Sequence, residues 1–175
     1  MNTKEEKERL KLIHQTIVQI EEKSNYRYVE IISQGEFRDV VTCTQQGKLK
    51  AGKIAAVDRV KNPQFDSWPS LDQRNIVKLE ETLFMPHVPS LCFIMDRHFT
   101  DLHEMVSKSL FINDQNNADD LKRWLLHVLT GLDHLHKNKL CHLNLKASNV
   151  LITYNSVARI GGFSRLSSST KPVTE

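Results

Sequence analysis

Apolar residues near the start of the chain recur at the spacing of an amphipathic helix. Leu10, Ile13, Ile17 and Ile20 follow one another at intervals of three or four residues within residues 3–23. Thr3 followed by Glu6 matches a capping box, which marks a helix start. A helix of this length is only marginally stable by itself. We therefore expect its apolar seam to pack on its own domain or on another chain.

From Tyr28 the pattern changes to the shorter period of β-strands. Turn-like residues at 33–35 and 45–47 separate runs rich in β-branched and apolar side chains. Two further apolar runs flank a segment with two prolines, Pro86 and Pro89. The pattern predicts five antiparallel strands, at about residues 28–32, 37–43, 53–60, 76–84 and 91–95.

Helical periodicity returns in the second half. Residues 101–108 predict a short helix, and residues 117–137 a longer one with Asn117 as its cap. The buried stripe of the longer helix is expected to contain Leu121, Leu125, Val128, Leu129, Leu132 and Leu135. Residues 167–175 show no periodicity and are expected to be a disordered tail. Strands followed by helices predict an α+β fold.

Composition narrows the function classes. The 175 residues are 39% hydrophobic, and the net charge of +3 is spread along the chain without a basic block, so neither nucleic acid nor a membrane surface is an expected partner. The longest apolar runs are far too short for a membrane span. Cys43, Cys92 and Cys141 are odd in number and lie in or beside apolar runs, which indicates reduced thiols. We expect a cytoplasmic protein.

The segment with the clearest chemical pattern is Cys141–Ile152, followed by Ala158–Ser164. It contains H-L-N-L-K-A-S-N-V-L-I and then G-G-F-S, and Gly162 follows Asn149 by thirteen residues. In residue types and in spacing, this segment resembles the catalytic loop H-R-D-L-K-x-x-N and the metal-binding D-F-G loop of protein kinases. The positions that match are His142, Leu145, Lys146, Asn149, Val150, Leu151 and Phe163. Those that differ are Leu143 for the Arg, Asn144 for the catalytic Asp, and Gly162 for the metal-binding Asp.

The resemblance implies a kinase-like N-lobe over residues 25–98, which follows the amphipathic helix of residues 1–24, and a partial C-lobe over 99–166. It also implies a degenerate ATP site. The cofactor-binding candidates are Gly35, the one glycine left in the phosphate loop, with Val40, Ala56 and Leu151 around the adenine, Met95 in the gatekeeper place, and Asn149. Weak binding of ATP without metal is the most that we expect of this site. No metal site is expected.

The same resemblance argues against phosphoryl transfer. Aligning Ala56-Val57-Asp58 with the family's A-V-K places a carboxylate where the phosphate-binding Lys belongs. Lys53 could substitute, but strand alternation places it on the face opposite Ala56. The interval from Asp58 to Asn75 is too short for the family's regulatory helix. With Asn144 and Gly162 also in place, we expect no catalytic residues and no enzyme.

These observations predict a pseudokinase that binds or regulates a signalling protein, such as another kinase or a chaperone. Because the chain ends soon after Phe163, before the family's activation segment, we expect a truncated domain. One alternative is an atypical serine/threonine kinase with weak ATP binding. Another is an interaction module that works through its N-terminal helix.

Overall fold

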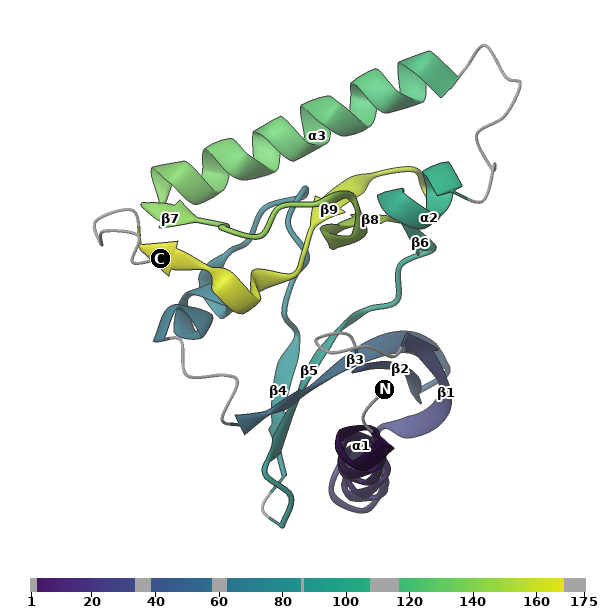
Figure 1. Ribbon diagram of the computed structural model, residues 1–175. Helices are drawn as coiled ribbons and strands as arrows, with labels where there is room; N and C mark the ends of the chain where they lie inside the picture. The colour runs from purple at the N-terminus through teal and green to yellow at the C-terminus, as the bar shows by residue number, and fades with distance from the viewer. Residues whose placement is uncertain (1–2, 34–38, 58–62, 86, 108–116, 169–175) are drawn as a thin grey trace. The chain divides into compact units, whose positions relative to one another are not determined.

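The computed structural model describes residues 3–33, 39–57, 63–85, 87–107 and 117–168. The chain divides into two compact units, the first made of residues 1–61 and 79–97 and the second of residues 62–78 and 98–175 (Figure 1). The N-terminal helix groups with the first unit, and residues 62–78, which fall inside the predicted N-lobe of residues 25–98, group with the second unit.

A five-stranded sheet forms the frame of the first unit. Its strand order is β1-β2-β3-β5-β4, and the strands are β1 Arg27–Ser33, β2 Asp39–Gln45, β3 Lys48–Ala56, β5 Ser90–Asp96 and β4 Glu81–Phe84. All neighbours are antiparallel. The predicted α+β class with a five-stranded antiparallel sheet is confirmed.

The turn between β2 and β3 fixes the register of this sheet. Gln46 and Gly47 have φ values of 51° and 77°, as in the two-residue hairpin turns that suit twisted strands. Gln45 therefore pairs with Lys48, and Val40 with Lys53. Strand β3 begins at Lys48, five residues before the predicted start, because the charged side chains of Lys48 and Lys50 interrupt the apolar signal at its beginning.

The two faces of the sheet carry different residues, since side chains alternate along each strand. One face contributes Val41, Cys43, Ile54, Cys92 and Ile94 to a buried cluster. Helix α1 (Thr3–Lys23) adds Ile13 and Ile20 to the same cluster, so this is the face that α1 covers. The opposite face carries Val40, Ala51, Lys53, Phe93 and Met95.

Helix α1 is attached to the sheet by a polar contact as well as by apolar packing. The buried Thr16 hydroxyl lies 2.7 Å from the carbonyl oxygen of Leu12 and 2.7 Å from Ser90 Oγ on β5. Leu10 is 42% exposed, so the buried seam runs through Ile13, Thr16 and Ile20. The predicted amphipathic helix therefore packs on the sheet of its own unit, which is one of the two alternatives that its sequence left open.

The second unit holds the remaining elements. In chain order they are η2 Pro63–Ser70, β6 Thr100–Asp101, α2 Leu102–Ser107, α3 Asn117–Lys137, β7 Leu140–Cys141, η3 Ala147–Asn149, β8 Val150–Ile152, β9 Ala158–Ile160, η4 Phe163–Arg165 and β10 Ser167–Ser168. Strands β6, β8 and β9 form one small sheet, and β7 pairs with β10. The expectation that Ser167 and Ser168 begin a disordered tail is wrong, because both pair with β7.

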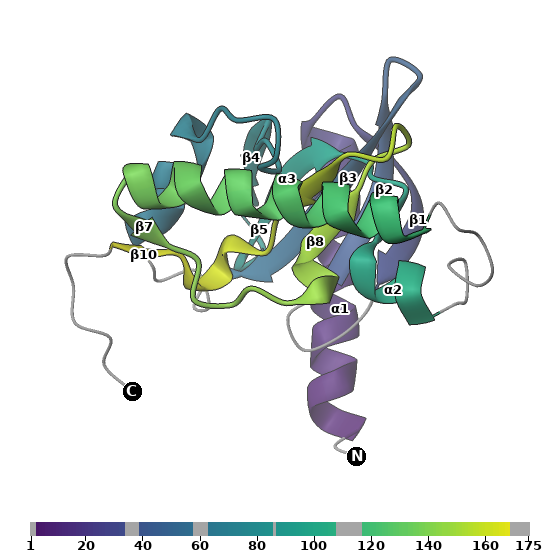
Figure 2. The same ribbon diagram turned by 90° about the horizontal axis from the view of Figure 1, so that it is seen from above.

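Helix α3 packs against β9 and, through Trp124, against β8, which it crosses in the view of Figure 2. Trp124 packs with Val150, Ile152 and Ala158, and Leu135 near the helix end is fully buried. A Cβ atom at Gly131 would lie 2.9 Å from Asn75 O and from Ile160 Cδ1, so only glycine allows this close approach. Across the described residues, neither long helix is apolar enough over its length to cross a bilayer.

Candidate functional site

Two of the predicted nucleotide-site residues, Val40 and Met95, lie on one face of the sheet, whereas a third, Ala56, lies on the opposite face. Val40 on β2 pairs with Lys53 on β3, and Met95 on β5 pairs with Ala51 on β3. These four residues therefore share the face opposite α1. Ala56 lies on the other face, with Ile54. The assignment of Ala56 to the adenine site is therefore wrong, and the residue that shares a face with Val40 and Met95 is Ala51.

This register also changes which residue corresponds to the family's phosphate-binding Lys. In the resembling family, the phosphate-binding Lys of the third strand follows an Ala by two residues. Ala51-Gly52-Lys53 has this spacing, and its Lys lies on the face of Val40 and Met95. A Cβ at Gly52 would come within 2.9 Å of Cys92 Sγ, so the small central residue is required. The rejection of Lys53 rested on the wrong Ala, and the third strand does carry a lysine at the family position.

Helix α1 does not replace the family's regulatory helix. In that family, a Glu on the regulatory helix forms an ion pair with the third-strand Lys. Because α1 packs on the face of Ile54 and Cys92, its glutamates lie on the side of the sheet away from Lys53.

In the second unit, Asn149 joins the two loops that carry the kinase-like motif. Its side-chain Nδ2 donates to the carbonyl oxygen of Asn144 at 2.7 Å. Its backbone carbonyl accepts a hydrogen bond from the amide of Gly161 at 2.8 Å. Gly162 follows with φ 78°, in the left-handed region. Asn149 and Gly162 are thus in direct contact, and Leu151 lies two residues after Asn149, on β8.

The buried His142 side chain forms hydrogen bonds to both of these loops. The ring is buried, its Nε2–H donates to the carbonyl oxygen of Gly161 at 2.8 Å, and its Nδ1 accepts from the amide of Asn144 at 3.2 Å. Burial lowers the pKa of the imidazole, and the hydrogen bond to Gly161 opposes that change in part. His142 is therefore a neutral structural connector between the two loops.

Phe163, the residue after Gly162, packs against two tilted rings. The Phe163 ring lies 5.2 Å from the Trp68 ring and 5.4 Å from the His142 ring, measured between centroids. Trp68 comes from the 3₁₀ helix η2, and its Nε1–H donates to the carbonyl oxygen of Val77 at 2.8 Å. The sequence analysis missed Trp68, because the two prolines of its segment suppress any helical signal.

The remaining predicted site positions cannot be placed. Gly35 and Asp58 lie outside the described residues. Within the described ranges, no group of three His, Cys, Asp or Glu side chains could hold a metal ion together. The first unit thus contributes a sheet face that carries Lys53, and the second unit, taken by itself, contributes two loops joined by hydrogen bonds.

The chain is similar to several curated protein kinases. It is 28% identical over 160 residues to cyclin-dependent kinase 9 of Danio rerio, a match that covers 82% of this chain and 42% of the relative. It is 26% identical over 140 residues to a probable serine/threonine-protein kinase, the MRK1 homolog of Encephalitozoon cuniculi, with 77% and 43% covered. Mitogen-activated protein kinase 5 of Arabidopsis thaliana is 27% identical over 155 residues, with 86% and 40% covered. The chain spans less than half the length of these relatives.

These relatives correct one prediction. The expectation that the chain is not an enzyme is wrong by this comparison, because the relatives are named as cyclin-dependent, serine/threonine and mitogen-activated protein kinases. One reason given for that expectation was a missing third-strand Lys, but Lys53 on β3 lies on the face of Val40. The sequence model of the protein kinase domain matches residues 26–174, which is most of the chain. The chain therefore belongs to the protein kinase family.

Proposed function

We propose that this kinase-family domain regulates a signalling protein by binding it. The observation that carries the proposal is that the two kinase-like loops keep their hydrogen-bonded structure although the family's two aspartates are absent from them. The hydrogen bonds from His142 to Gly161 and from Asn149 to Asn144 hold the loops together, while Asn144 and Gly162 stand at the positions of the family's two aspartates. A loop structure kept without these carboxylates suits a surface whose task is recognition.

The partner in this proposal is a protein, either another kinase or a chaperone, and the setting is the cytoplasm. One relative is named as a cyclin-dependent kinase, a name that itself states dependence on a protein partner. The chain is close to neutral for its size, with 24 basic and 21 acidic residues, which is consistent with a protein partner.

A second candidate is an atypical serine/threonine protein kinase. It is favoured by the kinase names of the relatives and by the position of Lys53 on the face of Val40 and Met95. Such an enzyme would need groups other than Asn144 to orient the substrate hydroxyl, since an amide does not accept a proton as a carboxylate does. It would also need magnesium held without a carboxylate at position 162.

One experiment separates the two candidates. The purified full chain is incubated with radiolabelled ATP, magnesium or manganese, and casein or myelin basic protein, beside the Lys53→Met variant. Label transfer that Lys53→Met abolishes would establish the atypical kinase. In parallel, the chain is titrated into assays of an active cyclin-dependent kinase and an active mitogen-activated protein kinase.

For the binding proposal we expect a several-fold change in the rate of one of these kinases at micromolar chain concentrations. The change should persist in Lys53→Met and be lost in His142→Ala, which removes the bond to Gly161. The matched control is His136→Ala, because His136 is exposed and lies outside the loops. No effect on either kinase, together with Lys53-dependent transfer, would reject the binding proposal in favour of the second candidate.

A further inference from the structure

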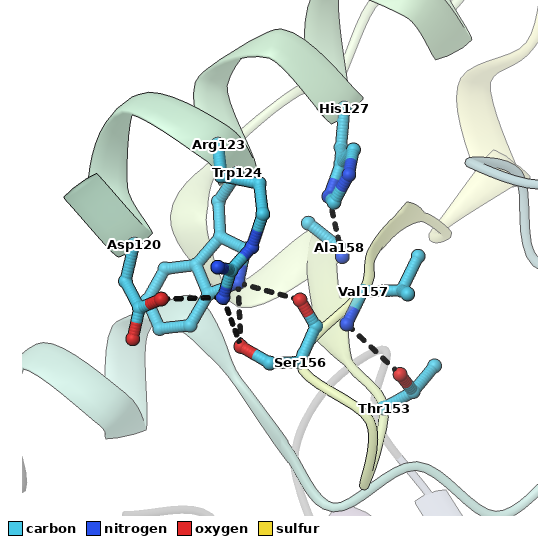
Figure 3. Close-up of polar contacts among 8 residues, drawn as sticks. All are labelled: Asp120, Arg123, Trp124, His127, Thr153, Ser156, Val157 and Ala158. Atoms are coloured by element: carbon cyan, nitrogen blue, oxygen red, sulfur yellow. Dashed lines mark hydrogen bonds and ion pairs between the residues drawn. The ribbon is translucent and has the colours of Figure 1, made fainter.

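Helix α3 meets the turn between β8 and β9 through polar side chains, and not through the leucines that its sequence pattern favoured. Leu121, Leu125 and Leu129 were expected in the buried stripe but are 43%, 60% and 53% exposed. Trp124 is buried instead, and its Nε1–H donates to the carbonyl oxygen of Ser156 at 3.0 Å (Figure 3). This side of α3 therefore holds the turn against the helix.

The hydroxyl oxygen of Ser156 receives two donors from α3. Arg123 Nη2 lies 2.9 Å and Trp124 Nε1 lies 3.2 Å from Ser156 Oγ, and both nitrogens carry hydrogens (Figure 3). These two hydrogen bonds use both lone pairs of the oxygen. The hydroxyl hydrogen must then point in the remaining direction, away from both donors. A group that replaces this hydrogen would extend in the same direction and leave α3 in place.

Arg123 has donors left for a further acceptor. A guanidinium carries five N–H donors, two of them on Nη2. In this structure Nη2 donates to Ser156 and to the carboxylate of Asp120. Among the described residues none accepts from Nε or Nη1, and the side chain is 47% exposed, so an anion can reach these donors. A planar fork of this kind binds a phosphate through two parallel hydrogen bonds.

The charges around the turn favour an anion. His127 lies one helical turn after Arg123 and accepts from the backbone amide two residues after Ser156, at 3.2 Å (Figure 3). Burial lowers the pKa of His127, and the positive charges of Arg123 and Arg74 lower it further. Surroundings that disfavour another positive charge favour a negative one. Asp120 opposes an anion here, but its ion pair with Arg123 reduces that opposition.

The turn can be reached from solvent. Tyr154 is 66% exposed, and Ser156 is half-buried. Hydrogen bonds between Thr153 and Val157 close the turn over a few residues, so it can open locally without unfolding of the sheet. A protein kinase supplied with ATP would then form a bond between the γ-phosphorus and Ser156 Oγ. The bond from that phosphorus to the oxygen bridging to the β-phosphate breaks, ADP leaves, and the hydroxyl proton passes to the catalytic carboxylate of that kinase.

We propose that Ser156 is a phosphorylation site and that Arg123 binds the phosphate, which fastens the β8–β9 turn to α3. Arg123 exchanges the hydroxyl oxygen for phosphate oxygens, and such charge-assisted bonds are the stronger kind. Trp124 keeps its bond to the carbonyl oxygen of Ser156 throughout. The enzyme that adds the phosphate is another protein kinase. This inference does not depend on the proposed function, because Ser156 lies outside the two kinase-like loops.

Titration of the phosphate tests its binding directly. Phosphoserine is incorporated at position 156 of the full chain by codon suppression, and its phosphorus-31 resonance is followed against pH. Because Arg123 favours the dianion, the second pKa of the phosphate should lie at least about 0.5 below its ordinary value of about 6. Arg123→Gln should restore the ordinary value, and Arg123→Lys should restore it only in part. Phosphoserine at position 70 is the control, because Ser70 is exposed and its hydroxyl donates to a backbone carbonyl. An ordinary pKa at position 156, or a lowered one that Arg123→Gln leaves unchanged, would overturn the proposal.

The modification itself is tested on the full chain produced in eukaryotic cells with their serine phosphatases inhibited. Mass spectrometry should find phosphate on Ser156, and Ser156→Ala should remove it. The phosphorylated chain should melt about 2–4 °C above the unmodified chain, and Arg123→Gln should cancel this gain. A chain that carries no phosphate on Ser156, whether or not other serines such as Ser70 are modified, would show that the site is wrongly assigned.

Discussion

Gly162 lies against Asn149 so closely that a Cβ atom at position 162 would be 2.3 Å from Asn149 Cγ. The family carries an aspartate at position 162, so this contact decides whether the consensus residue can simply be restored. An aspartate side chain at position 162 can be accommodated only if the Asn149 side chain moves and its hydrogen bond to the Asn144 carbonyl oxygen is broken.

We therefore predict that Gly162→Asp destabilises the domain. The left-handed φ of 78° costs a residue with a side chain roughly 1–2 kcal/mol, and the collision with Asn149 adds to this. Gly47→Asp is the matched control, because Gly47 has a φ of 77° but no atom within 4 Å of its Cβ position. Urea unfolding should show a larger loss for Gly162→Asp than for Gly47→Asp. Adding Asn149→Gly should narrow the difference, and equal losses would show that the collision is relieved freely.

The fold was largely predictable from the sequence because its long helices and strands have strong periodicity. The helix over residues 3–23 and the helix over 117–137 were both expected, and so was the antiparallel sheet. The start of β3 at Lys48 was not, because Lys48 and Lys50 interrupt the apolar pattern. With the strand expected to begin at residue 53, Ala56-Val57-Asp58 was matched to the family's A-V-K in place of Ala51-Gly52-Lys53.

The candidate site was predictable where residues are close in sequence and unpredictable where they are distant. The thirteen-residue interval between Asn149 and Gly162 identified the two kinase-like loops, and the structure places these two residues against each other. The packing of Trp68 on Phe163 joins segments far apart in the chain, and no local pattern marks it. The tail shows the same limit, because pairing with β7 holds Ser167 in place although its own segment has no periodicity.

Nucleotide binding, which we expect to be weak, should depend on Lys53 and not on magnesium. Gly162 offers no carboxylate to a metal, and the amide of Asn149 is engaged with Asn144. Thermal melting with millimolar ATP should show a small stabilisation that magnesium leaves unchanged and that Lys53→Ala removes. Lys48→Ala is the control, because Lys48 lies on the same strand but on the opposite face. Stabilisation by several degrees only when magnesium is present would contradict this prediction.

Helix α1 should contribute substantially to the stability of the first unit. Ile20 is buried in the cluster with Cys43 and Ile94, so Ile20→Ala should lower the free energy of unfolding by about 2–5 kcal/mol. Val18→Ala, at a position 37% exposed on the same helix, should change it by less than about 0.5 kcal/mol. Deletion of residues up to Ser24 should have a larger effect than either. An unchanged melting midpoint after deletion would show that the sheet does not need the helix.

Acidification should destabilise the domain through His142. Burial lowers the pKa of His142 in the folded state below its ordinary value of 6.5, so the unfolded chain binds the proton more readily. The stabilising contribution of the neutral ring is therefore complete above pH 6.5 and is lost as the pH falls below it.

Urea unfolding at pH 7.5 and pH 5.5 would measure this dependence. The wild-type free energy of unfolding should fall more over this range than that of His142→Gln, because only the wild type loses the contribution of the neutral ring. His127→Gln should remove a further part of the pH dependence, because burial and the charges of Arg123 and Arg74 lower the pKa of His127 as well. His136→Gln, at an exposed position outside both loops, is the control variant. If all three variants show the same slope as the wild type, the neutral His142 ring does not determine the acid sensitivity of the fold.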